Sequence, residues 1–123
     1  MLVLKTVPRR YTQDLLAEHL QDVFSREDID LVHLPIDLKS GRHLGYALVG
    51  FRTPAGCARF AAEFHLAGMR ELLPGANRSA VCELLPAKCS SRAEFLETMR
   101  ASPALRELCS RRPACLPVLL GEQ

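Results

Sequence analysis

The sequence LGYALVGF, residues 44–51, alternates side chains in a way that predicts a β-strand with one buried face. Successive side chains of a strand point to opposite faces of its sheet. The face toward a core would carry Ala47, Val49 and Phe51. The outward face would carry Tyr46, Leu48 and Gly50. Because an exposed aromatic ring can stack on an unpaired base, this strand indicates a nucleic-acid-binding surface.

The spacing of apolar residues predicts further elements before this strand. Residues 2–7 form an apolar run that ends at Pro8, which predicts a first strand. Thr12 is a suitable N-cap for a helix whose apolar residues recur on one face as far as Phe24. Residues 29–36 form a second apolar run, and the polar residues 37–43 have the composition of a hairpin loop. The second strand and the strand at 44–51 should therefore pair antiparallel.

A second helix and a fourth strand are predicted after residue 51. Pro54 suits the first turn of a helix. One side of that helix would be buried through Cys57, Phe60, Ala61 and Phe64. After a loop at 74–77, residues 81–85 predict a short strand that stops at Pro86. The order β-α-β-β-α-β predicts a ferredoxin-like α+β fold, in which both helices cover one face of a four-stranded antiparallel sheet and the other face is free.

The chain continues past this pattern, so we expect two parts, residues 1–88 and a C-terminal extension of residues 89–123. Ser91 can cap a further helix that runs to Ala101. Its apolar side would carry Ala93, Phe95, Leu96 and Met99. A short helical turn and an extended tail would follow in residues 103–119. The helix could cover the open face of the sheet or pack at its edge, and periodicity does not decide between these arrangements.

Composition favours one globular domain, because 123 residues with 48% hydrophobic and 24% charged content support one core. Sixteen Lys and Arg against fourteen Asp and Glu give a net charge of +2. A charge this small excludes the strong overall positive field of a non-specific DNA-binding protein. Contacts to nucleic acid must therefore come from a local cluster.

Cysteine usage and motif content exclude other classes of protein. The five cysteines form no C-x-x-C pair, and the chain lacks the opening of a secretory signal. A reduced intracellular setting, in the nucleus or the cytoplasm, is therefore expected. Neither the cysteines nor the four histidines have metal-ligand spacing, so no metal or other cofactor is expected. The chain also lacks a membrane-length apolar run, a Gly-rich phosphate loop and hydrolase motifs, so an enzyme is not expected.

Several segments taken together resemble a known family. They are VPRRYTQDLL from Val7, LPIDLKS from Leu34, GYALVGF from Gly45 and VCEL from Val81, with SPALREL and RRPACLPVLL nearer the end. This combination is similar to the C-terminal RNA recognition motif of Mei-two-like proteins, which are regulators of meiosis and development. The resemblance implies binding of single-stranded RNA in post-transcriptional regulation, by a motif with a helical C-terminal addition. The chain departs from the family pattern at Leu48, where the family has Phe, and at Thr6, where Asn is common.

The resemblance and the strand pattern place a candidate RNA-binding surface on the open face of the sheet. Three positions there correspond to the stacking positions of RNA recognition motifs: Val3, Tyr46 and Leu48. Side chains around them could contact phosphates or bases: Lys5, Arg9, Arg10, Tyr11, Lys39, Arg42, His43 and Lys88. Because only Tyr46 among the three stacking positions is aromatic, and each base stack is worth about 1–3 kcal/mol, the two missing rings predict weak binding.

A protein-interaction module is the alternative hypothesis. The aliphatic face made by Val3, Leu48 and Leu85 could take up an apolar helix or a partner peptide in place of bases. The helix predicted at residues 91–101 is one such helix within the chain itself. Nothing in the sequence indicates dimer symmetry, so a monomer is the default.

Overall fold

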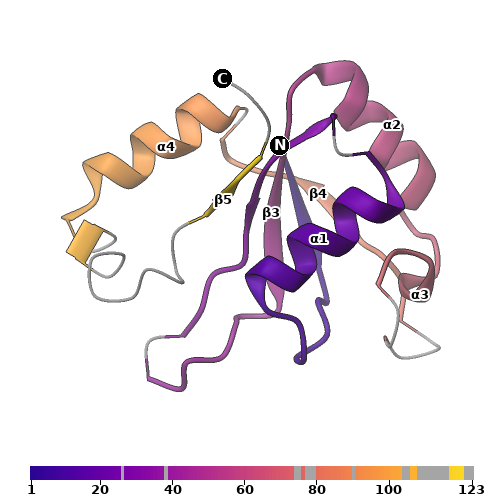
Figure 1. Ribbon diagram of the computed structural model, residues 1–123, viewed down its shortest axis with the longest axis horizontal. Coiled ribbons are helices and arrows are strands. Elements are labelled where there is room, and N and C mark those ends of the chain that lie inside the picture. Colours follow the sequence, from indigo (N-terminus) through magenta and orange to yellow (C-terminus); the bar gives the residue numbers. More distant parts are fainter. Residues whose placement is uncertain are drawn as a thin grey trace.

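Strand β3, Tyr46–Phe51, lies at the centre of an antiparallel sheet in the computed structural model of the chain (Figure 1). Within the described part of the chain the sheet has five strands, in the order β4-β1-β3-β2-β5. The other strands are β1 (Leu2–Lys5), β2 (Ile29–His33), β4 (Leu84–Pro86) and β5 (Val118–Leu119). The structure describes residues 1–25, 27–37, 39–73, 76, 80–89, 91–103, 106–107 and 117–120. The predicted α+β fold is confirmed, and β5 extends the predicted four-stranded sheet by one strand.

Helices α1 (Gln13–Val23) and α2 (Pro54–Phe64) pack together on one face of the sheet (Figure 1). A third long helix, α4 (Arg92–Ala101), follows β4 in the chain. Each of these three helices begins where a hydroxyl side chain accepts a hydrogen bond from the amide three residues ahead. The capping residues are Thr12, Thr53 and Ser91. The helix starts predicted from Thr12, Pro54 and Ser91 are therefore confirmed.

The core lies between the sheet and helices α1 and α2. Fully buried strand residues facing these helices include Leu4, Ala47 and Val49. The helices contribute Leu16, Leu20 and Phe60 to the same cluster. Fully burying one large apolar side chain stabilises a fold by about 1.5–3 kcal/mol, so this cluster fixes which side of each strand faces inward. The alternate strand residues must then face away from the helices.

Strands β1, β2 and β3 are each shorter than the sequence predicts. β3 begins at Tyr46 and not at residue 44, directly after Gly45, whose φ is 93°. β1 stops at Lys5 and not at residue 7, since Thr6 has a left-handed backbone conformation with φ of 64°. β2 stops at His33 and not at residue 36. Beyond it, Ile36 pairs only with His43, in an isolated bridge within the loop that leads to β3.

Strand β4 begins three residues later than predicted, at Leu84 in place of residue 81. Val81 is instead bridged to Gly68, and Cys82 exchanges two backbone hydrogen bonds with residues 66 and 67. This local pairing gives the backbone of residues 81 and 82 its hydrogen bonds outside the main sheet. Pro86, predicted to follow the strand, is its last residue, because β4 is an edge strand that tolerates a missing N–H.

The sequence pattern does not predict two short elements. Helix α3 (Met69–Leu72) buries Met69 and Leu72 completely. Strand β5 lies in the tail that was expected to be extended, and pairs antiparallel with β2. Most of the loop predicted at 74–77 and of the turn and tail predicted at 103–119 lies outside the described residues.

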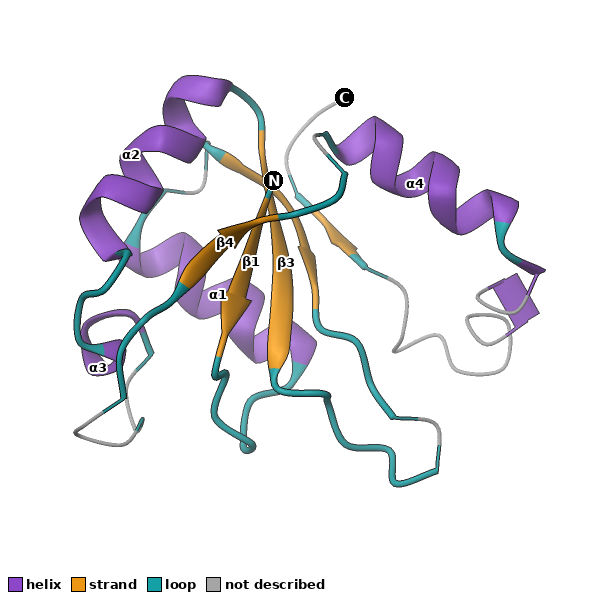
Figure 2. Ribbon diagram, turned by 180° about the vertical axis from the view of Figure 1, so that it is seen from behind, coloured by secondary structure: helices purple, strands orange, loops and turns teal. Residues whose placement is uncertain are grey.

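Helix α4 packs at the β2 and β5 side of the sheet and does not lie across its centre (Figures 1 and 2). Seen from the side opposite α1 and α2, strands β4, β1 and β3 have no described helix in front of them (Figure 2). Of the two arrangements left open by the sequence, edge packing is therefore the observed one.

Thr6 is a position where a substitution should stabilise the fold. A β-branched residue is strained at a φ of 64°, whereas Asn tolerates this left-handed conformation. Thr6 is also exposed, so no buried contact is lost. We expect Thr6→Asn to raise the free energy of unfolding by about 1 kcal/mol, as measured by urea denaturation. An unchanged or lower stability would show that the Thr6 backbone is not strained, and Thr6→Val, which keeps the β-branch, should give no gain.

Candidate nucleic-acid interface

The surface opposite α1 and α2 is built around the pairing of β1 with β3. Lys5 lies opposite Tyr46, and Val3 lies opposite Leu48. The alternate residues of these strands are buried in the core, so these four side chains face outward. Lys5 is exposed, and the other three are half-buried. A flat aromatic ring and an ammonium group are thus neighbours on one accessible face.

This face combines one aromatic ring with aliphatic neighbours. On the β4 side, Leu85 lies opposite Val3 and is 39% exposed. The half-buried ring of Tyr46 offers a stacking surface for a base, and Lys5 beside it can meet a phosphate. The aliphatic side chains can contact a base or a partner side chain, but they supply no aromatic stack. The face therefore provides one good stacking position.

Two loops meet at the end of the sheet where Tyr46 and Lys5 lie. His43, in the loop between β2 and β3, joins this loop to the one between β1 and α1. Its Nδ1 atom accepts a hydrogen bond from the Gly45 amide at 3.0 Å. That contact leaves the proton of a neutral ring on Nε2, which lies 2.9 Å from the Pro8 carbonyl oxygen and donates to it. Both ring nitrogens are used, so His43 fixes the relative position of the loops.

A groove of about 1180 Å³ lies between these loops. Its apolar lining includes Leu34, Ile36 and Leu44. Its basic lining is provided by Arg9, Arg10 and Arg42. The acidic residue of the lining, Asp37, accepts hydrogen bonds from the Lys39 amide at 3.3 Å and from Ser40 Oγ at 3.0 Å, so its charge is partly used in the turn. Apolar lining with arginines around it suits a nucleotide, whose base is flat and whose phosphate is anionic.

The structure brings most of the predicted residues together, but Tyr11 is buried at the groove and Lys88 lies apart. Tyr11 is 2% exposed and packs edge-on against His19, with 5.3 Å between ring centroids. In this conformation a base cannot reach its ring, so an RNA contact by Tyr11 stays a prediction that burial does not favour. Lys88 is exposed but follows β4, whose Pro86 lies opposite Leu2, so it is at the other end of the sheet from Tyr46.

Sequence reasoning did not place His33 on the interface. His33 ends β2 opposite Leu48, so it shares the outward face of the sheet. Its ring lies against the Phe95 ring of α4, with 5.3 Å between the centroids. Burial lowers the pKa of His33 to about 4, so the ring is neutral at pH 7. The alternation of β2 could have indicated its direction, but not its contact with a residue so far along the chain.

Other chemistry is not assembled in the described part of the chain. No group of three His, Cys, Asp or Glu side chains is arranged there to hold a metal ion. Cys57, Cys82 and Cys89 are free thiols, and burial raises the pKa of the Cys82 thiol to about 11. Cys109 and Cys115 lie outside the described residues. None of the helices within the described ranges is both long and apolar enough to cross a membrane.

Comparison with known proteins agrees with this geometry. The family model described as RNA recognition motif 2 matches residues 1–100. The solved structures similar to this one include the second RNA recognition motif of the yeast poly(U)-binding protein Pub1, with a TM-score of 0.54 and 16% identity over 72% of this chain and 94% of that one. The motif of Rna15 with bound RNA has a TM-score of 0.54 and 17% identity over 80% of this chain and 95% of that one. A complex of the Sex-lethal protein with RNA has a TM-score of 0.52 and 21% identity over 74% and 48% of the two chains.

The fold and the outward face therefore define an RNA recognition motif, a class that is typically non-catalytic. The chain belongs to the RNA recognition motif 2 family, to which the C-terminal motifs of Mei-two-like proteins belong, so the predicted resemblance is confirmed. It is 26% identical to Protein MEI2-like 2 of Oryza sativa subsp. japonica over 118 residues. This match covers 96% of the chain but 13% of the rice protein.

The burial of His33 predicts a pH-dependent stability. Its pKa of about 4 in the folded chain is below the ordinary value of 6.5, so the unfolded chain binds the proton more readily. The stability that comes from keeping His33 neutral is thus fully present above pH 6.5 and is lost as the pH falls toward 4. Between pH 7 and pH 5 we expect the free energy of unfolding to fall by about 1–2 kcal/mol more in the wild type than in His33→Gln. Equal losses in urea denaturation of both proteins would contradict this burial.

Proposed function

We propose that this chain is a single-stranded RNA-binding module that takes unpaired bases on the outward face of β1 and β3. The observation that carries the proposal is the accessible ring of Tyr46 beside the ammonium group of Lys5, on a sheet face in front of which no described helix lies. Membership of an RNA recognition motif family supports the same reading. The role in the cell that fits such a module is post-transcriptional regulation.

The groove supports the proposal by extending the path of an RNA strand. It begins at the end of the sheet where Tyr46 lies, and its lining includes Arg9 and Arg42. These guanidinium groups are exposed and can neutralise phosphates. Because the chain has a net charge of only +2, such local contacts must supply most of the electrostatic attraction. Among the similar structures, the Rna15 motif and the Sex-lethal protein are in complexes with RNA.

Uptake of an apolar peptide is the second candidate function. It is favoured by the aliphatic row of Leu85, Val3 and Leu48, in which Leu85 is 39% exposed. A protein partner would use these side chains without needing the ring of Tyr46 or the arginines of the groove. The two candidates therefore respond differently to substitutions at these positions.

Replacement of the Tyr46 ring tests the proposed function directly. Titration of the whole chain with a mixed pool of labelled single-stranded RNA, followed by fluorescence anisotropy, should give salt-dependent binding. Tyr46→Ala should weaken it by about 1–3 kcal/mol, roughly tenfold or more, because one base stack is lost. Tyr46→Phe keeps the ring and should bind as the wild type does.

Unchanged affinity in a folded Tyr46→Ala variant would reject stacking on this face. An absence of RNA binding by the folded wild type would favour the peptide-binding alternative. In that case Leu48→Ala, not Tyr46→Ala, should reduce capture of an apolar helical peptide.

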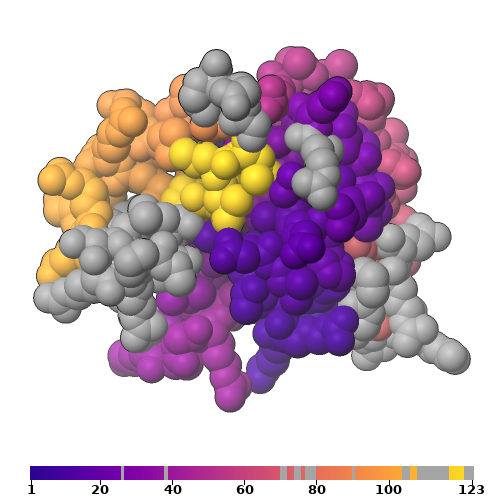
Figure 3. Space-filling view, viewed as in Figure 1, coloured from indigo at the N-terminus to yellow at the C-terminus, as the bar shows by residue number. Residues whose placement is uncertain are grey.

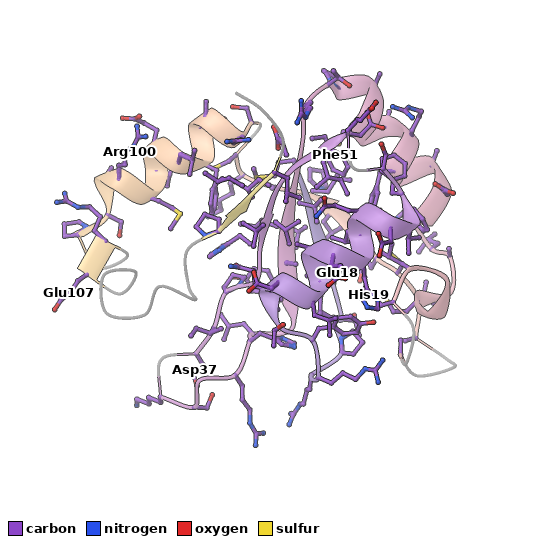
Figure 4. All side chains as sticks on the ribbon, viewed as in Figure 1. Glu18, His19, Asp37, Phe51, Arg100 and Glu107 are labelled. Atoms are coloured by element: carbon purple, nitrogen blue, oxygen red, sulfur yellow. The ribbon has the colours of Figure 1, made fainter. Side chains whose placement is uncertain are left out.

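The two arginines of the groove should affect the salt dependence. Each phosphate contact to a single strand contributes about 0.7 to the slope of log K against log salt concentration. The double variant Arg9→Gln with Arg42→Gln should therefore reduce that slope by about 1.4 and weaken binding at low salt. Arg100→Gln is the matched control, because Arg100 lies on α4, far from the hairpin loop of Asp37 (Figure 4). An equal slope for the double variant and the wild type would exclude phosphate binding in the groove.

A further inference from the structure

Helix α4 covers the outward face of β2 at His33, whereas no described helix covers the outward faces of β1 and β3. Asp30 forms an irregularity between Ile29, which pairs with Phe51, and Leu31, which pairs with Gly50. In a β-bulge two residues oppose one residue of the partner strand. The side chains of Asp30 and Leu31 both lie over Gly50, since a Cβ atom there would be 2.7 Å from Asp30 Oδ1 and 3.1 Å from Leu31 Cβ. A carboxylate is thus held on the sheet face that bases would approach.

Two polar atoms beneath this cover have no hydrogen-bond partner among the described residues. They are Oδ1 of Asp30 and Nδ1 of His33. Asp30 is 9% exposed, and burial raises the pKa of its carboxyl group against the opposing effect of Arg92 and Arg52. Buried polar atoms are nearly always paired, because leaving one unpaired destabilises the fold. A ligand that reached this face could supply the missing hydrogen bonds to both atoms.

Among the described residues, two side chains of α4, Arg92 and Phe95, hold this cover against β2 and β5. Nη1 of Arg92, in the first turn of α4, donates to the carbonyl oxygens of Asp30 and Leu120, each at 3.2 Å. The Phe95 ring lies against the His33 ring, and Phe95 is the one buried side chain of α4. Strand β5, yellow in Figure 3, lies between α4 and the rest of the sheet. It pairs with β2 through two residues. In the described part of the chain, one aromatic contact and one arginine thus anchor the helix.

The covered face continues the accessible one. In the sheet register Leu85 lies opposite Val3, Val3 opposite Leu48, and Leu48 opposite His33. This row crosses β4, β1, β3 and β2, and its fourth member lies under Phe95. An RNA strand that followed the row would therefore meet α4 at β2.

We propose that α4 is a displaceable cover and that the β2 face beneath it is a further base-binding position, for a base with an exocyclic amino group. The inference rests on the proposed function. The Asp30 carboxylate would accept a hydrogen bond from the amino group, as acidic side chains do from N4 of cytosine. The His33 ring, released from Phe95, would stack on the base. Binding of such a base and release of α4 then form one coupled equilibrium.

Nuclear magnetic resonance on the whole wild-type chain can follow the cover directly. In the free protein, ring protons of His33 and Phe95 should give nuclear Overhauser contacts, because the ring centroids are 5.3 Å apart. Addition of saturating oligocytidine should abolish these contacts, since α4 leaves the sheet. Oligouridine lacks the amino group and should leave them in place while still contacting Tyr46. Contacts that persist at saturation with oligocytidine would overturn the inference.

Variants of the cover give an independent test by anisotropy. Phe95→Ala removes the aromatic anchor and should bind oligocytidine roughly tenfold more tightly than the wild type does, with little change for oligouridine. Asp30→Ala in the same background should cancel this gain. Thr98→Ala is the matched control, because Thr98 is an exposed α4 residue whose hydrogen bonds within the described ranges go to Glu94 in the same helix and to Cys89 just before it. Circular dichroism establishes that each variant is folded.

The outcomes separate this inference from the proposed function. Loss of binding in Tyr46→Ala, together with unchanged affinity in Phe95→Ala, would support RNA binding on β1 and β3 and reject the displaceable cover. Binding that appears only in Phe95→Ala would show that the cover blocks the face in the wild type. If neither the wild type nor Phe95→Ala binds RNA, both proposals fail. A partner protein could also displace α4, and the His33–Phe95 ring contacts would then be lost without RNA. That result would likewise show that the occupant of the β2 face is not a base.

Discussion

The pairing of β1 with β3 is the constraint on which the rest of the structure depends. Burial of Leu4, Ala47 and Val49 against the helices fixes the inward faces of both strands. Since side chains alternate, the same burial forces Lys5 and Tyr46 outward and into register with each other. A shift of one residue would exchange the two faces, exposing core side chains and burying the ammonium group. The candidate interface is therefore maintained by the stability of the core.

The loops at the end of these strands depend on the same pairing. The Val7 amide donates to the Gly45 carbonyl oxygen at 2.9 Å, just where both strands end, and both Thr6 and Gly45 have positive φ angles. The two loop segments then turn away from the sheet. His43 connects them again through its hydrogen bonds with Gly45 and Pro8. The groove is thus formed before any ligand arrives, which lowers the entropy cost of binding for the protein.

Much of this arrangement could be predicted from the sequence, because it depends on local patterns. Alternation and capping chemistry predict strand β3 to within two residues, the caps at Thr12 and Ser91, and the outward direction of Tyr46. The position of β4 could not be predicted, since Val81 favours a strand but pairs with Gly68. The β2 bulge and the contacts of Asp30 with Arg92 and Leu120 join residues distant in the chain. Periodicity does not reveal such pairs, and it does not show that Tyr11 is buried.

An uncovered face with one aromatic ring poses an energetic problem for RNA binding. A single base stack gives about 1–3 kcal/mol, which is small beside the cost of ordering a flexible strand. The structure holds two further surfaces in continuity with Tyr46, the basic groove at one end and the covered β2 face at one side. Because both would be occupied by the same strand, their contributions add without a second loss of translational freedom. If RNA binds as proposed, affinity that no single position can supply would be available to a strand long enough to reach all three surfaces, and RNA length would then determine recognition.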